Sequence, residues 1–154
     1  MATSLRHPTR PRAPQAIAAN EYASLLGLRA RSPLAVAEQV SKGIGYEAFE
    51  KLRGVIELPA AELARLVNIP SRTLHRRKIE KRLHADESDR LVRLSRVFAE
   101  AIALFEGDRE EARRWFSSPA PALGDRTPLS MTSTDVGARE VEALIGRLEY
   151  GVFA

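Results

Sequence analysis

Basic side chains concentrate in one short stretch of the sequence. Residues 72–82 hold six Lys and Arg against a single acid, Glu80. An arginine can donate two hydrogen bonds to O6 and N7 of guanine in the major groove, and both Lys and Arg neutralise phosphates. The residue types and their density therefore predict binding to nucleic acid. The alternative is a solvated basic helix face, which is what most charge runs are.

Other chemistry finds little support in the sequence. There is no cysteine, and the three histidines stand at positions 7, 75 and 84, so neither a thiolate zinc site nor a cysteine nucleophile is expected. No Gly-rich phosphate loop and no nucleophile–base pair stands out. We therefore expect no enzymatic activity, no cofactor and no metal.

The basic stretch falls at the end of a helix-turn-helix pattern. In residues 58–82, LPAAELARLVNIPSRTLHRRKIEKR, apolar residues at helical spacing predict a supporting helix, and Asn68 occupies the turn. Asparagine tolerates the left-handed conformation that such turns need. Ile69 should fill the corner, and Ser71 should cap the second helix.

The N-terminal end of that second helix should enter the major groove. The residues expected at base edges are Ser71, Arg72, His75 and Arg76, and those expected at the phosphate backbone are Arg77, Lys78, Lys81 and Arg82. Arg77 fits the pattern poorly, because recognition helices often carry a core residue there. Either the helix is short or Arg77 lies at its edge.

The charge is divided unevenly between the two halves of the 154-residue chain. Residues 1–82 carry 15 Lys and Arg against 7 Asp and Glu, whereas residues 83–154 carry 9 against 13. The halves therefore differ in sign, +8 and −4, which favours a polyanion as partner of the first half and another kind of partner for the second. The bland alternative is an uneven surface charge.

The expected fold is all-α in two parts. Residues 1–16 are rich in Pro and Arg and should form a disordered basic arm, residues 17–82 a Cro/repressor-like helix-turn-helix region, and residues 83–154 a helical C-terminal domain. A long helix over residues 85–106, capped by Asp86, should open that domain. No apolar run reaches membrane-spanning length, and the lack of cysteine fits a reducing cytoplasm.

Several segments after residue 58 resemble a known family, the Xre/MbcA/ParS antitoxins of RES-type toxin–antitoxin pairs. The segments are RTLHRR, SDRLVRL, ARRWF, PALG, RTPL and LEYGVFA, in this order and spacing. The resemblance covers roughly residues 58–154. Asp125 departs from it, because the family often has a second glycine after Gly124.

The resemblance implies an antitoxin that represses its own operon and dimerises. Its C-terminal domain would block the NAD-consuming site of a RES-domain toxin. The residues that this implies for toxin binding lie in one segment and in the tail. They are Leu123, Gly124, Arg126, Pro128, Leu129, Arg147, Glu149, Tyr150, Gly151, Val152 and Phe153.

The residues also allow other interpretations. For Trp115, Leu123 and Leu129 the alternative is an ordinary place in the core, and for the apolar tail it is docking on its own domain. For the whole chain the alternative is a helix-turn-helix transcription regulator whose C-terminal helices serve only for dimerisation.

Overall fold

The computed structural model describes residues 17–151. Within this range the chain is all-α, as predicted, and contains isolated bridges but no strand. The first half contains α1 (Ala19–Leu25), α2 (Pro33–Lys42), α3 (Tyr46–Ile56), α4 (Ala60–Leu66) and α5 (Ser71–Glu80). The second half contains α6 (Ala85–Leu104), α7 (Arg109–Phe116), the short 3-10 helix η1 (Pro121–Leu123), α8 (Pro128–Met131) and α9 (Asp135–Glu149). The predicted arm, residues 1–16, lies outside the described residues.

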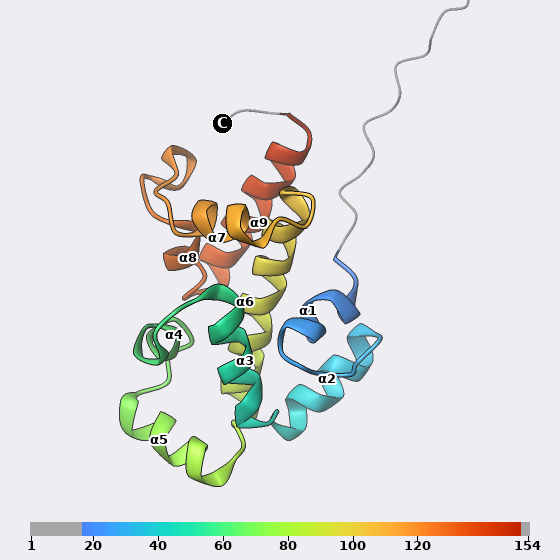
Figure 1. The fold of residues 1–154 in the computed structure, drawn as a ribbon, viewed down its shortest axis with the longest axis vertical. Coiled ribbons are helices and arrows are strands. Elements are labelled where there is room, and N and C mark those ends of the chain that lie inside the picture. The colour runs from blue at the N-terminus through green and yellow to red at the C-terminus, as the bar shows by residue number, and fades with distance from the viewer. Residues whose placement is uncertain (1–16, 152–154) are drawn as a thin grey trace, which may run out of the picture.

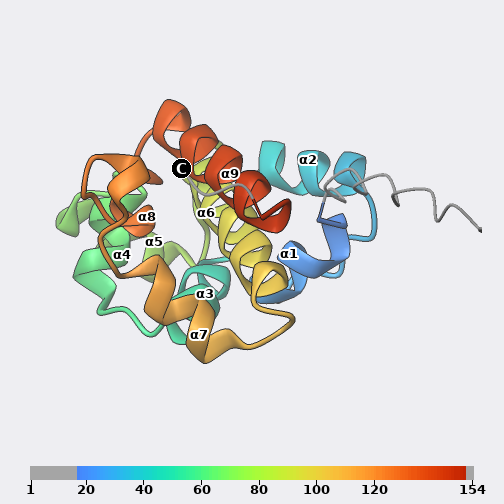
Figure 2. The same ribbon diagram turned by 90° about the horizontal axis from the view of Figure 1, so that it is seen from above.

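The long helix α6 is the centre of the fold. It runs through the middle of the molecule, with α1 and α2 on one side and α4, α5 and α8 on the other (Figures 1 and 2). Its apolar residues at helical spacing, among them Leu91, Leu94 and Phe98, are buried. They contact α1, α2 and α3 from the first half and α7 and α9 from the second.

Buried hydroxyl groups also tie α6 to the first half. Ser95 is fully buried and donates to the carbonyl oxygen of Tyr22 at 2.7 Å. Ser88, equally buried, accepts a hydrogen bond from the amide of Ile44 at 2.9 Å. One hydrophobic core therefore extends across residue 83, where the sequence predicts a domain boundary. That boundary stays a prediction.

Two predicted helix caps are wrong. Helix α6 begins after His84 rather than at Asp86, because the carboxylate of Glu87 accepts the His84 amide at 2.8 Å and closes the first turn. Helix α5 begins after Pro70, and Ser71 is its first residue, with no capping hydrogen bond from its side chain. The turn before α5 is as predicted, since Asn68 is left-handed with φ of 54° and Ile69 is buried.

Among the described residues, no helix has the length and apolar character needed to cross a membrane.

The two glycines of α9 differ in their surroundings, which leads to a first prediction. A Cβ on Gly137 would overlap the carbonyl oxygen of Met131, whereas a Cβ on Gly146 would meet nothing within 4 Å. Gly137→Ala should therefore lower the free energy of unfolding by about 2 kcal/mol. Gly146→Ala should raise it by roughly 0.5–1 kcal/mol, because alanine stabilises a helix interior. Urea unfolding measures both, and two changes of the same sign would contradict the described packing of α9.

Candidate nucleic-acid interface and partner-binding surface

The predicted reading helix α5 projects at one end of the molecule (Figure 1). Its exposed face carries Arg72, His75 and Arg76, with Ser71 at the start of the helix. Residues three and four apart share one face of a helix, so these side chains form a single basic surface. The structure thus brings together the four residues that were predicted to contact base edges.

Ile79 lies on the same face, one turn after His75 and Arg76, and is 69% exposed. Its place in α5 follows from helical spacing, but it is not among the predicted site residues. An apolar side chain at this position can contact the methyl group of thymine.

The four residues predicted at the phosphate backbone do not behave alike. Lys78 and Lys81 are exposed, and Lys81 ends α5 in a left-handed conformation with φ of 60°. Arg82 is also exposed, but its guanidinium donates to the carbonyl oxygens of Lys42 and Gly43 at 3.1 and 3.3 Å. Arg82 therefore links the C-terminal end of α5 to the C-terminal end of α2 by hydrogen bonds.

Arg77 is not on this surface, and its prediction as a phosphate contact needs correction. It is only 7% exposed, and its Nε donates to Oε1 of Glu87 at 2.6 Å. Two further groups lie beside the guanidinium of Arg77. Oε2 of Glu80 is 3.4 Å from Nη1, and Nδ1 of His84 is 3.1 Å from Nη2. The hydrogen bond to Glu87 holds the pKa of Arg77 above its usual value. The position expected to hold an apolar core residue holds a buried ion pair.

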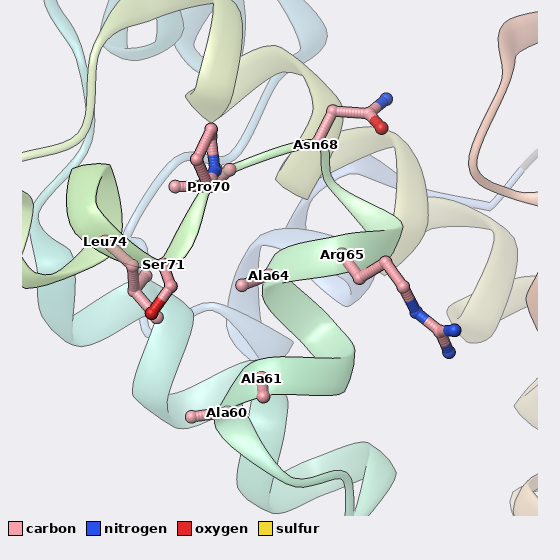
Figure 3. A pocket seen from close by; sticks show the side chains of 9 residues that line it. Ala60, Ala61, Ala64, Arg65, Asn68, Pro70, Ser71 and Leu74 are labelled. Atoms are coloured by element: carbon pink, nitrogen blue, oxygen red, sulfur yellow. The ribbon is translucent and has the colours of Figure 1, made fainter.

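This ion pair matters because α5 has little apolar contact with α4. Three alanines of α4, Ala60, Ala61 and Ala64, face Leu74 of α5 across an apolar groove of about 680 Å³ (Figure 3). Alanine side chains are too short to fill this space. Leu74 is only partly buried. Leu74 packs only in part against the core, so the polar contacts of α5 contribute to its orientation.

A second arginine, Arg90 of α6, holds the other end of α5. Its Nε donates to the carbonyl oxygen of Val67 at 2.6 Å, and its Nη2 to that of Asn68 at 3.4 Å. These carbonyls belong to the turn before α5. Helix α6 thus fixes the turn through Arg90 and the last turns of α5 through Glu87. Arg90 and Glu87 are not among the predicted site residues. The sequence held one signal for Glu87, because an arginine at position 77, where a core residue is expected, needs a buried carboxylate as partner.

The predicted partner-binding segment around residues 123–129 is partly buried. Leu123, Pro128 and Leu129 are buried in the core. For the two leucines this agrees with the alternative to toxin binding, namely an ordinary place in the core. Gly124 and Arg126 are exposed. Direct contacts of this segment are therefore limited to its exposed residues, while the buried ones hold its shape.

Asp125 explains the departure from the family pattern. It adopts φ of 60°, directly after Gly124 with φ of 65°. Glycine reaches this left-handed region freely, and aspartate is one of the few other residues that tolerate it. The turn can therefore keep the same backbone with an aspartate in place of the second glycine.

The other predicted partner residues gather at the end of α9, far from α5 (Figure 1). Glu149, Tyr150 and Gly151 are exposed, and Arg147 is half-buried. The Nε of Arg147 is buried and has no hydrogen-bond acceptor among the described residues. Val152 and Phe153 lie outside the described residues.

Carboxylates flank this end of α9. Burial, together with Glu142 and Glu149, raises the pKa of Glu100 to about 7, although Arg96 opposes the shift. Arg96 pairs with Glu142 at 3.0 Å. Because Glu100 then titrates near neutral pH, the charge beside the partner-binding surface depends on pH.

Two family models together cover most of the chain. Residues 35–96 match the antitoxin Xre-like helix-turn-helix domain, and residues 100–151 match the antitoxin Xre/MbcA/ParS C-terminal toxin-binding domain. The chain is also similar to curated proteins named Antitoxin Xre. The protein from Yersinia enterocolitica is 38% identical over 130 residues, which are 84% of this chain and 88% of the relative. The protein from Photorhabdus laumondii is 35% identical over 114 residues, 73% of this chain and 77% of the relative.

The Arg77–Glu87 pair gives a second prediction. Arg77→Met should lower the free energy of unfolding by about 3 kcal/mol, because it leaves the charge of Glu87 buried without a partner. Adding Glu87→Gln should recover a large part of this stability, since the amide oxygen can still accept the His84 amide. Arg72→Met, on the exposed face, should change the free energy by less than about 0.5 kcal/mol. Urea unfolding of the wild-type chain and these three variants measures the effects, and an equal effect of both arginine substitutions would remove the pair as an anchor.

Proposed function

The chain belongs to the Xre/MbcA/ParS antitoxin family, and we propose that it neutralises a RES-domain toxin and represses its own operon. In this proposal the C-terminal surface occludes the toxin's NAD-consuming site, and α5 reads operator DNA in the cytoplasm. The antitoxin acts by binding and catalyses no reaction. The observation that carries the proposal is that two different surfaces lie near opposite ends of the long helix α6 (Figure 1).

The basic surface supports the DNA-binding part of the proposal. Arg72, His75 and Arg76 are exposed together, while Arg77 and Arg90 are used to hold the helix and its turn. A helix presented in a fixed orientation can place arginines on base edges, whereas Lys78 and Lys81 at its far end suit phosphate contacts.

The distance between the two surfaces supports binding of both partners at once. Helix α6 has 20 residues, which corresponds to about 30 Å at 1.5 Å per residue. The reading helix lies near its start, and the end of α9 lies beside its other end (Figure 1). A toxin held at the end of α9 therefore need not displace DNA from α5.

Self-association is part of the same proposal. Helix-turn-helix proteins read two half-sites, about 34 Å apart, as dimers.

A third prediction tests the reading face. Replacing both Arg72 and Arg76 by alanine should weaken binding to the operator by about 1–3 kcal/mol for each arginine that reads a base. Lys78→Ala is the matched control, because removing one cation from the phosphate backbone should weaken binding to all sequences alike and reduce the salt slope by about 1. Fluorescence anisotropy with operator and scrambled DNA measures both. Unchanged operator binding by the double variant would refute the assignment of α5.

A fourth prediction concerns the tail. Deletion of residues 150–154 should abolish toxin neutralisation, measured as growth rescue on coexpression, and leave operator binding intact. The Arg72/Arg76 double variant should behave in the opposite way, neutralising without binding DNA. If the deleted chain neutralises with full affinity, the tail is structural. If the intact chain gives no growth rescue and no toxin co-purifies with it, the chain is a regulator whose C-terminal helices only dimerise.

A further inference from the structure

A small apolar groove opens beside the C-terminal half of α9. Trp115, Pro119, Ala120 and Pro121 form one wall, and Leu144 and Leu148 of α9 form the other. Its volume is about 210 Å³. The groove lies between the two segments assigned to toxin binding, since one wall leads into residues 123–129 and the other into the tail.

The groove leaves apolar surface without a described partner. Trp115 packs against Phe105 and Phe116, with ring centroids 6.2 and 6.4 Å apart, yet it remains only half-buried because it also lines the groove. Leu148 is half-buried for the same reason. Covering these side chains would remove further apolar area from water, which is favourable.

The backbone turns at the end of α9. Gly151 is left-handed, with φ of 69°, and its amide donates to the carbonyl oxygen of Leu148 at 3.1 Å. Helices that end in this way reverse the chain, and the residue after the glycine commonly makes an apolar contact with the last turn. The residues that follow here are Val152 and Phe153, both apolar.

We propose that Val152 and Phe153 occupy this groove in the free antitoxin, with the ring of Phe153 against Trp115. The inference rests on the proposed function in one respect only, namely that a toxin later takes the same tail. The tail starts close to the groove, because Leu148 both lines it and accepts the amide of Gly151, and two residues of extended chain beyond Gly151 span about 7 Å. The size also fits, because an apolar cavity of about 150 Å³ holds benzene and this groove is larger.

Docking would give the tail two alternative partners. In the free chain Phe153 is buried in the groove, and in the complex it is buried in the toxin's site. The apparent affinity for toxin is then reduced by the fraction of tail that is undocked. The groove therefore regulates how readily the antitoxin engages its target.

The composition of the chain allows a direct test in the free protein. Trp115 is the only tryptophan, and there is no cysteine. A single cysteine introduced by Ala154→Cys can carry a bimane dye, whose emission is quenched by contact with tryptophan. Emission of the labelled chain should be lower than emission of the same chain with Trp115→Phe. Equal emission of the two would overturn the proposal.

Variants at position 153 supply the matched control. Phe153→Ser should relieve the quenching, because the hydroxyl gains nothing in an apolar groove, whereas Phe153→Leu should largely retain it. In the unlabelled chain, Phe153→Ser should also increase the quenching of Trp115 emission by acrylamide. Identical results for Ser and Leu would contradict docking, and this readout does not depend on the Trp115 substitution.

Addition of a RES-domain toxin separates the two proposals. Dequenching on binding supports both the groove and the transfer of the tail. Quenching that persists in the complex supports docking in the groove and contradicts insertion of the tail into the toxin. Absence of quenching before any toxin is added overturns the groove alone and leaves the proposed function untouched.

Discussion

The buried ion pair between Arg77 and Glu87 is the constraint on which the arrangement of this antitoxin depends. The reading helix α5 faces α4 across alanines and an open groove, so apolar packing alone does not fix its direction. One carboxylate performs two tasks, since Glu87 both binds Arg77 and closes the first turn of α6. The angle of the reading helix is thereby set by the start of α6. A buried pair costs desolvation energy, and its advantage here is the orientation that it specifies.

Helix α6 transmits this constraint through the whole molecule. Its first turns hold α5 and the turn before it, its middle carries the buried serines that bind the first half, and its last turns pack against α7 and α9. The proposed DNA-reading and partner-binding surfaces are therefore parts of one packed body. A single core with two separated surfaces suits a protein that we propose to hold operator and toxin together.

Periodicity and turn chemistry predict much of the fold from the sequence. The all-α class, the turn at Asn68, the corner at Ile69 and the exposed face of α5 follow from local patterns. The predicted caps of α5 and α6 are wrong because each cap depends on which neighbour a side chain meets. The roles of Arg77, Arg90 and Arg82 depend on partners 10 to 40 residues away, and no local pattern reveals such pairs. The apolar residues of the 123–129 segment could not be assigned to core or surface until their burial was known.

The central claim is that one rigid helix keeps the two surfaces apart, so that both partners bind at the same time. A mobility-shift titration with operator DNA, the antitoxin and increasing RES-domain toxin tests it directly. We expect a slower-migrating complex of all three components, with the antitoxin's affinity for operator changed by less than about twofold. Release of free DNA as toxin is added would contradict it, because it would mean that the two surfaces overlap or are strongly coupled.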